Sequence, residues 1–239
     1  MSEILRVSKL NKRFGGVVVA RDIDFSLERG RMHCLIGPNG AGKSSFFRLI
    51  LGEHAPDSGT IEFRDEDITA LRPFQRIRRG ISVKFQVPGI FKALSARQNL
   101  EIAFQRHLRG HDLDATIRRV LDFAGLEGEA ATLAGTLSHG QQQWLEIGMA
   151  VGVEPSLLLL DEPTAGMSPD ETRRTGEMLH ELNARGITIL AVEHDMAFVE
   201  QIADRVTVLH FGAIFAEGTI AEIVDHVGVQ EIYLGAADG

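Results

Sequence analysis

The hydrophobic pattern of the chain alternates between strand-like and helix-like segments. Residues 4–27 are rich in β-branched side chains around one Gly-Gly pair, which predicts strands with a turn at that pair. A short apolar run at 32–36 predicts a further strand, and apolar positions at helical spacing within 44–51 predict a helix that ends at Gly52. The order from residue 32 onward is therefore strand, glycine-rich loop, helix.

From about residue 93 to 150 the apolar residues recur at helical spacing and β-branched runs are nearly absent, which predicts a helical part inserted into an α/β core. Beyond it, short apolar runs alternate with helical segments. We expect strands at 157–160, 187–192 and 206–209, and helices at 169–183, 196–203 and 221–234, the last covering the sheet. Strands that alternate with helices indicate a mostly parallel sheet.

Composition narrows the class of protein. The 239 residues suit one sizeable domain, and the net charge of −8 argues against a broad nucleic-acid-binding surface. We interpret the basic cluster Arg72, Arg76, Arg78 and Arg79 as a solvated helix face. The single cysteine, Cys34, excludes an intramolecular disulfide, favours a reducing compartment and is expected to be a buried structural thiol. Neither a signal-peptide pattern nor an apolar run of membrane-spanning length is present, so we expect a soluble chain whose membrane role comes through a partner.

Residues 37–44, Gly-Pro-Asn-Gly-Ala-Gly-Lys-Ser, fit the P-loop pattern for binding phosphate. Small residues let successive backbone N–H groups turn inward around phosphate oxygens, and the following helix presents its positive N-terminal end to the same anion. Lys43 is placed to reach the β- and γ-phosphates, and the Ser44 hydroxyl to ligate Mg²⁺. The alternative, a glycine turn that only caps a helix, is disfavoured because a strand precedes the loop and a helix follows it.

Two carboxylates, Asp161 and Glu162, follow the buried strand expected at 157–160. Ligands of α/β proteins bind at the carboxyl ends of the strands. Asp161 is therefore a candidate to hold Mg²⁺ through water, and Glu162 a candidate to polarise the attacking water. The alternative is an Asp-Glu-Pro turn that merely leaves the strand, and the P-loop earlier in the chain favours the functional interpretation.

Further segments complete a pattern: the run Leu-Ser-His-Gly-Gln at 137–141, Gln86 after Val-Lys-Phe, His194 after Val-Glu, the run Ala-Gly-Met-Ser at 165–168, and Phe14. Taken singly, they are consistent with a helix cap, a polar loop residue, a strand-end histidine, a turn and a core aromatic. Their order and spacing resemble those of the nucleotide-binding subunits of ABC transporters over essentially the whole chain. In that family they correspond to the signature, the Q-loop, the switch histidine, the D-loop and an aromatic that stacks on adenine.

The resemblance implies an α/β fold: a P-loop NTPase (RecA-like) core with an N-terminal antiparallel β subdomain and an inserted α-helical subdomain. The core would comprise 1–91 and 153–239, and the helical signature subdomain 92–152, within one ATPase domain. It also implies that two subunits pack head to tail, so that the P-loop of one faces the signature of the other across ATP and Mg²⁺.

The residue roles that the resemblance implies fall into three groups. Nucleotide contacts are expected from Phe14, Gly37, Pro38, Asn39, Gly40, Ala41, Gly42, Lys43, Ser44 and Ser45 of one subunit and from Ser138, Gly140 and Gln141 of the other. Catalytic roles are expected for Glu162, His194 and Gln86. Mg²⁺ contacts are expected from Ser44, Gln86 and Asp161.

Two departures from the usual family pattern point to one branch. His139 replaces the glycine that is usual at the third position of the signature, and Ser168 replaces the usual D-loop aspartate. Both departures resemble the sequences of one branch of the family, the importers for branched-chain amino acids, amides and urea. Residues 137–149 resemble the urea-type members of that branch in particular. The implied partners are membrane permeases, a second copy or paralogue of the ATPase, and indirectly a periplasmic solute-binding protein, at the cytoplasmic face of the inner membrane. We favour the paralogue.

Two other functions compete with the importer. A motor for lipid or lipopolysaccharide export would have similar length and motifs. A soluble ABC ATPase acting on DNA or ribosomes is disfavoured, because the chain has no internal repeat, no sustained heptads and no cysteine pairs.

The segment Val-Pro-Gly-Ile-Phe at 87–91 is apolar for a loop, and we expect it to help receive a short helix of a membrane subunit. The alternative is that this loop packs onto the chain's own helical part.

Overall fold

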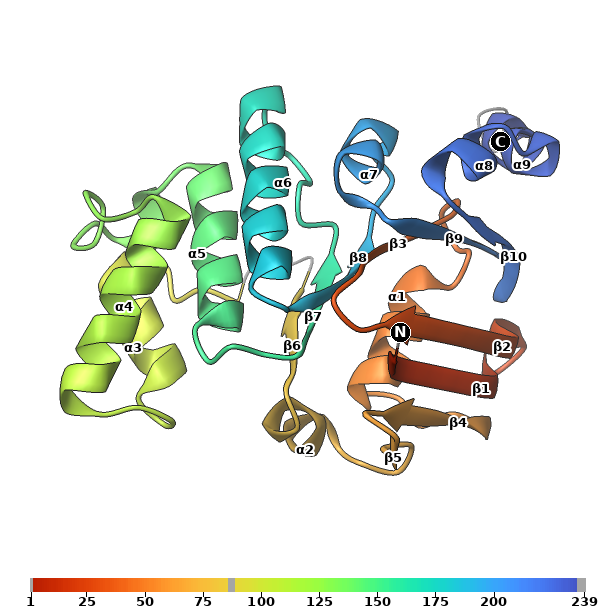
Figure 1. The fold of residues 1–239 in the computed structure, drawn as a ribbon, viewed down its shortest axis with the longest axis horizontal. Coiled ribbons are helices and arrows are strands. Elements are labelled where there is room, and N and C mark those ends of the chain that lie inside the picture. The colour runs from red at the N-terminus through yellow and green to blue at the C-terminus, as the bar shows by residue number, and fades with distance from the viewer. Residues whose placement is uncertain (1, 86–88, 236–239) are drawn as a thin grey trace.

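The computed structural model describes residues 2–85 and 89–235, and Figure 1 shows them as two sheets with helices around them and a group of helices at one end. This arrangement confirms the predicted fold class. Among the described residues, no helix has the length and apolar character needed to cross a membrane.

The N-terminal sheet is antiparallel and has the strand order β2-β1-β4-β5. Its members are β1 (Glu3–Phe14), β2 (Val17–Glu28), β4 (Ser58–Phe63) and β5 (Glu66–Asp67). The turn between β1 and β2 lies at Gly15-Gly16, as predicted, and Gly15 has the positive φ of 56° that such a turn favours in glycine.

The second sheet has the order β10-β9-β3-β8-β7-β6, and every neighbouring pair except β10 with β9 is parallel. Its members are β3 (Met32–Ile36), β6 (Ile81–Lys84), β7 (Leu157–Asp161), β8 (Thr188–Val192), β9 (Arg205–His210) and β10 (Ala213–Gly218). Every residue of β3 and β8 is buried, as expected for strands covered on both faces.

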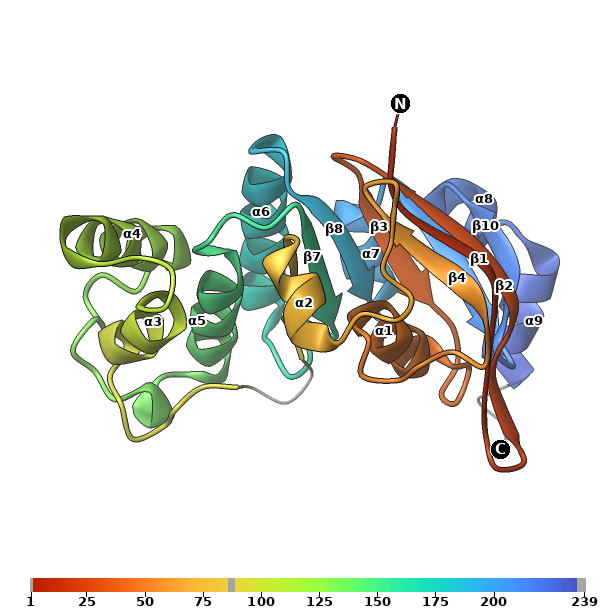
Figure 2. The same cartoon turned by 90° about the horizontal axis from the view of Figure 1, so that it is seen from below.

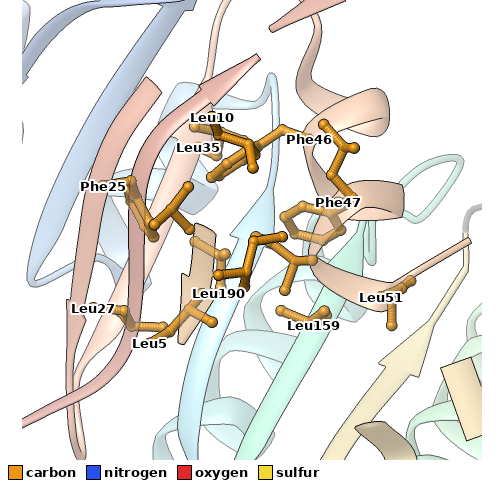
Figure 3. Close-up of a cluster of buried hydrophobic side chains, with 14 of the residues drawn as sticks. Leu5, Leu10, Phe25, Leu27, Leu35, Phe46, Phe47, Leu51, Leu159 and Leu190 are labelled. Carbon is orange, nitrogen blue, oxygen red and sulfur yellow. The ribbon is translucent and has the colours of Figure 1, made fainter. Parts of the chain in front are cut away.

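Three hydrophobic clusters hold these layers together. The first lies between the antiparallel sheet, one face of the parallel sheet and α1 (Lys43–Leu51), and Figure 3 shows Phe25, Leu35, Phe46 and Leu190 meeting there. The second covers the opposite face. Part of this second cluster comes from four helices, which are α6 (Pro169–Ala184), α7 (Met196–Ile202), α8 (Ile220–Val224) and α9 (Val227–Gly235).

The third cluster is the core of the helical part, formed by α3 (Ala96–Phe104), α4 (Gly110–Ala124) and α5 (His139–Val151), with a 3₁₀ turn at Ala134–Thr136. The predicted helical character of this stretch is confirmed. In both views these helices lie at the end of the molecule away from the antiparallel sheet (Figures 1 and 2). The sequence reasoning did not identify β4, β5, β6 or β10, and the expected C-terminal helix is two short helices, α8 and α9.

The interpretation of the basic cluster at residues 72–79 was wrong for one of its members. Arg76 lies in α2 (Pro73–Arg78) and is only 1% exposed. Its guanidinium donates to the carbonyls of Leu49 and Ile50 at 2.8 and 2.7 Å, and to those of Thr69 and Leu71 at 2.9 and 3.0 Å. Burial lowers the pKa of Arg76 to about 10, partly opposed by Asp67. The side chain therefore satisfies the last carbonyls of the helix that follows the P-loop.

We expect Arg76→Met to lower the free energy of unfolding by about 3 kcal/mol, because several buried carbonyls would lose their donor at once. The melting temperature should fall by about 6–12 °C for a chain of this size. Arg79→Met is the matched control, since Arg79 is exposed and its ion pair with Glu66 (3.2 Å) lies at the surface. Equal melting temperatures for the two variants would contradict the structural role of Arg76.

Candidate active site

Neighbouring parallel strands end at one edge of the sheet, and the predicted site residues follow those ends. The P-loop follows β3, His194 follows β8, and Asp161 and Glu162 lie at the end of β7. Gln86, expected after β6, lies outside the described residues. The parallel order β3-β8-β7-β6 thus gathers chemistry that is spread over more than a hundred residues of sequence.

The P-loop is fitted tightly between the two sheets. A Cβ on Gly37 would lie 2.2 Å from the Leu209 carbonyl oxygen of β9, and one on Gly42 would lie 2.5 Å from the Val19 carbonyl oxygen of β2. The carbonyl of Ala41 accepts from the N–H of Gly212, in the turn between β9 and β10, at 2.9 Å. The loop conformation is therefore held by backbone contacts that only glycine permits.

The remaining members of the P-loop lie at the entrance to α1. Lys43 Nζ donates to the carbonyls of Gly37 and Pro38 at 2.6 and 3.0 Å. Burial lowers the pKa of Lys43, and the charges of Glu162 and Asp161 oppose this shift. Asn39, Gly40 and Ser44 are exposed, and Ser45 is half-buried.

A cavity of about 250 Å³ is lined by Ser44 of α1, Asp161 of β7 and Phe85 beyond β6, among others. Asp161 Oδ1 is buried and has no hydrogen-bond partner among the described residues. Burial, and secondarily the charge of Glu162, raises the pKa of Asp161. A hydroxyl and an unpartnered carboxylate oxygen facing one cavity fit a Mg²⁺ ion, which takes few protein ligands alongside waters and phosphate oxygens.

Glu162 has a strained backbone, with a φ of 47° in the left-handed region. Its N–H donates to the Val192 carbonyl at 3.0 Å, and its Oε1 lies 3.9 Å from Nδ1 of His194. The His194 side chain is 62% exposed, whereas that of Glu162 is 25% exposed. Strain of this kind costs about 1–3 kcal/mol. Glu154 has a similar φ of 52°, so the strain alone does not distinguish Glu162; its position beside His194 at the end of β7 does.

Two further buried groups surround the site and were missed by the sequence reasoning. Glu193 is fully buried and accepts from the N–H and the hydroxyl of Thr164 at 3.3 and 2.9 Å, and burial raises its pKa.

Lys84 at the end of β6 is also fully buried, and its Nζ has no hydrogen-bond partner among the described residues. Burial lowers the pKa of Lys84, against the charges of Glu146, Asp161, Glu193 and Glu162. The available signal was the position of both residues at the ends of buried strands.

Phe14 ends β1 with 42% of its surface exposed, so it is not a core residue. Its ring meets His54 edge-on at a centroid distance of 4.9 Å, and Lys12 Nζ lies 5.2 Å from the ring centroid. The ring therefore has an accessible surface, as a stacking platform requires.

The signature residues form the N-terminus of α5. Ser138 is the N-cap, its Oγ accepts from the Gln141 N–H at 3.2 Å, and Gln141 Oε1 accepts from the Ser138 N–H at 2.9 Å, which is a capping box. A Cβ on Gly140 would lie 2.3 Å from Glu171 Oε1. In both views α5 and α1 lie on opposite sides of α6, so the signature is separate from the P-loop of its own chain (Figures 1 and 2).

A glycine-rich loop with a lysine between β3 and α1, together with an Asp-Glu pair at the end of β7 in the same parallel sheet, defines a P-loop nucleoside triphosphatase. The family model described as ABC transporter matches residues 20–165. The chain therefore belongs to the ABC transporter family, and it is an ATP-binding cassette ATPase.

Individual relatives agree with this assignment. The chain is 35% identical to the high-affinity branched-chain amino acid transport ATP-binding protein BraF of Pseudomonas aeruginosa, over 98% of each sequence. It is 34% identical to the lipopolysaccharide export system ATP-binding protein LptB of Acidithiobacillus ferridurans, also over 98% of each. The crystal structure of the ADP conformation of MJ1267, an ATP-binding cassette of an ABC transporter, has a TM-score of 0.92 at 31% identity and covers 98% of this chain and 100% of that one.

Proposed function

We propose that this chain is the ATPase subunit of an importer for branched-chain amino acids, amides or urea. The observation that carries the ATPase part is that the P-loop with Lys43, and Asp161 and Glu162 at the end of β7, lie at one edge of the same parallel sheet, where the charges of both carboxylates act on Lys43. The importer part is supported by the likeness to BraF and by the importer-like residues His139 and Ser168.

In this proposal Lys43 and the P-loop N–H groups bind the phosphates, and Ser44 and Asp161 hold Mg²⁺, which would neutralise phosphate charge. Glu162 orients the attacking water or takes its proton, and His194 contacts the γ-phosphate. Phe14 stacks on adenine, and Gln86 retains its expected role beside the metal. These roles fit the burial and spacing of the described residues.

The proposed working form is a head-to-tail dimer, with a second copy or a paralogue of the chain. The separation of α5 from α1 within one chain supports this form, because the N-terminus of α5 then closes the nucleotide site of the partner subunit. The proposal keeps the division of the chain into a core, 1–91 and 153–239, and a helical signature part, 92–152.

A docking surface for a permease is proposed at Phe91 rather than over the whole loop. Val87 and Pro88 lie outside the described residues, and Ile90 is only 9% exposed because it packs into the helical cluster, as the alternative interpretation holds. Phe91 is 52% exposed, while buried Asn99 accepts from its N–H at 2.7 Å and donates to its carbonyl at 3.1 Å. The ring is therefore presented outward from a fixed backbone. In this proposal the chain is peripheral to the membrane, because it is held there through its contact with the permease.

Purification of the tagged chain from native membranes in mild detergent, followed by mass spectrometry, tests the proposal. We expect two permeases, a second ATPase and a periplasmic solute-binding protein. Lipid-export components would instead support the rival function suggested by the likeness to LptB. Ribosomal or DNA-repair partners without permeases would contradict transport altogether.

The same purification tests the docking surface. Phe91→Glu is expected to lower permease recovery about tenfold or more, because exposed aromatics are common hot spots of interfaces, while basal ATP hydrolysis is retained. Val224→Glu is the control, since Val224 is 48% exposed on α8, at the opposite end of the molecule from α3 (Figure 1). Equal recovery from the two variants would exclude Phe91 from the interface.

A further inference from the structure

The signature segment (137–141) and the D-loop segment (165–168) lie in contact within this one chain. His139 Nε2 is 2.8 Å from the carbonyl oxygen of Ala165. Because a carbonyl only accepts, the imidazole nitrogen donates in this hydrogen bond. Gly166 leaves room for the ring, since a Cβ there would lie 3.2 Å from His139 Nε2.

Glu171 makes a second connection between the same segments. Its Oε2 accepts from the N–H and the hydroxyl of Ser168, each at 2.9 Å. Its Oε1 lies against Gly140. Hydrogen bonds from the main chain and side chain of Ser168 lower the pKa of Glu171, and a hydrogen bond from the side chain of Ser138 lowers it to a smaller extent. One carboxylate therefore touches the D-loop on one side and the signature on the other.

From Ala165 the contacts continue to the main chain of Glu162. The Ala165 N–H donates to the main-chain carbonyl of Glu162 at 3.3 Å. The main chain of Ala165 thus accepts a hydrogen bond from His139 at its carbonyl oxygen and donates one to Glu162 from its nitrogen. The two departures from the usual family pattern, His139 and Ser168, both belong to this bonded group.

We propose that His139 is a positioning residue that links the two nucleotide sites of the dimer. The inference rests on the proposed head-to-tail dimer, in which Ser138 serves the partner's nucleotide and Glu162 serves the chain's own. When Ser138 moves onto the partner's phosphate, the hydrogen bond from His139 displaces Ala165 and with it the strained backbone of Glu162. Binding at one site therefore favours the hydrolytic geometry at the other.

The test is steady-state ATP hydrolysis by the complex purified with its permeases, measured against ATP concentration. His139→Gly removes the side chain and is expected to bring the Hill coefficient toward one and to raise the half-saturating ATP concentration about fivefold, the equivalent of one ordinary hydrogen bond. His139→Gln retains an N–H donor and is expected to keep most of the cooperativity. ADP binding by the single subunit, which uses its own P-loop, should not change in either variant.

Gly166→Ala separates coupling from direct contact with nucleotide. It leaves His139 in place but puts a methyl group 3.2 Å from Nε2, so we expect it to share the loss of cooperativity. Unchanged cooperativity in His139→Gly would overturn the inference. Equal loss in His139→Gln, or a defect in His139→Gly that Gly166→Ala does not share, would overturn it as well. Failure of the proposed function is a different result: no ATP hydrolysis by the unaltered complex.

Discussion

Replacing Glu162 with glutamine is expected to lower ATP turnover by about a thousandfold while ATP binding is retained. General bases contribute about 10²- to 10⁴-fold to catalysis, and the amide of glutamine cannot accept the proton. The substitution keeps the size of the side chain and the left-handed backbone at φ 47°, so the fold should not change. Because ATP would remain intact between the subunits, the variant should accumulate as an ATP-bound dimer. Phosphate release and size-exclusion chromatography measure the two effects.

Glu154→Gln is a closely matched control for this substitution. Glu154 is also a glutamate with a positive φ, 52°, but its carboxylate pairs with Arg119 of α4, away from the P-loop. We expect its turnover to remain near the wild-type value, so that backbone strain and lost charge are both excluded as causes. Wild-type turnover in Glu162→Gln would remove Glu162 from the hydrolytic role and leave His194 and Gln86 as the remaining candidates.

The parts of the fold that the sequence predicted are those whose signal is local. All five residues of β3 are buried, so the apolar run at 32–36 identified the strand to the residue. The P-loop and the Asp-Glu pair are short motifs, and the residues that form each motif are close together in the sequence. By contrast, β10 lies at the edge of its sheet with five of its six residues half-buried or exposed, and its apolar run of four residues, 213–216, is followed directly by Glu217.

The parts that sequence reasoning missed depend on contacts between distant segments. Arg76 has the composition signal of a surface residue, and only the positions of four carbonyls on other segments make it a buried one. Glu146 accepts from the Gly89 N–H, 57 residues away, at 2.8 Å. His139 and Ala165 are 26 residues apart, and nothing in either segment indicates that they touch. The last two of these pairs follow from how the helical part is set against the core.

Replacing Gly37 with alanine is expected to lower kcat/KM for ATP about a hundredfold and the free energy of unfolding by about 3 kcal/mol. Gly37 has a φ of 147°, and a Cβ there would lie 2.2 Å from the Leu209 carbonyl oxygen, which is backbone and cannot swing aside. The loop or β9 must move to make room. The Gly37 carbonyl also accepts from Lys43 Nζ at 2.6 Å, so the movement shifts the lysine together with the cradle. Steady-state kinetics and thermal unfolding measure the two losses.

Gly30→Ala distinguishes this clash from the general cost of alanine at positive φ. Gly30 has a φ of 73°, but no atom lies within 4 Å of its ideal Cβ position, and it precedes β3 at the end opposite the P-loop. The Gly30→Ala variant should lose about 1–2 kcal/mol of its free energy of unfolding, while kcat/KM for ATP remains unchanged. If Gly37→Ala loses no more activity than Gly30→Ala, then β9 does not hold the P-loop in place. A loss confined to Gly37→Ala would mean that the hairpin of β9 and β10 is part of the phosphate site, because β9 forms the wall against which the P-loop is set.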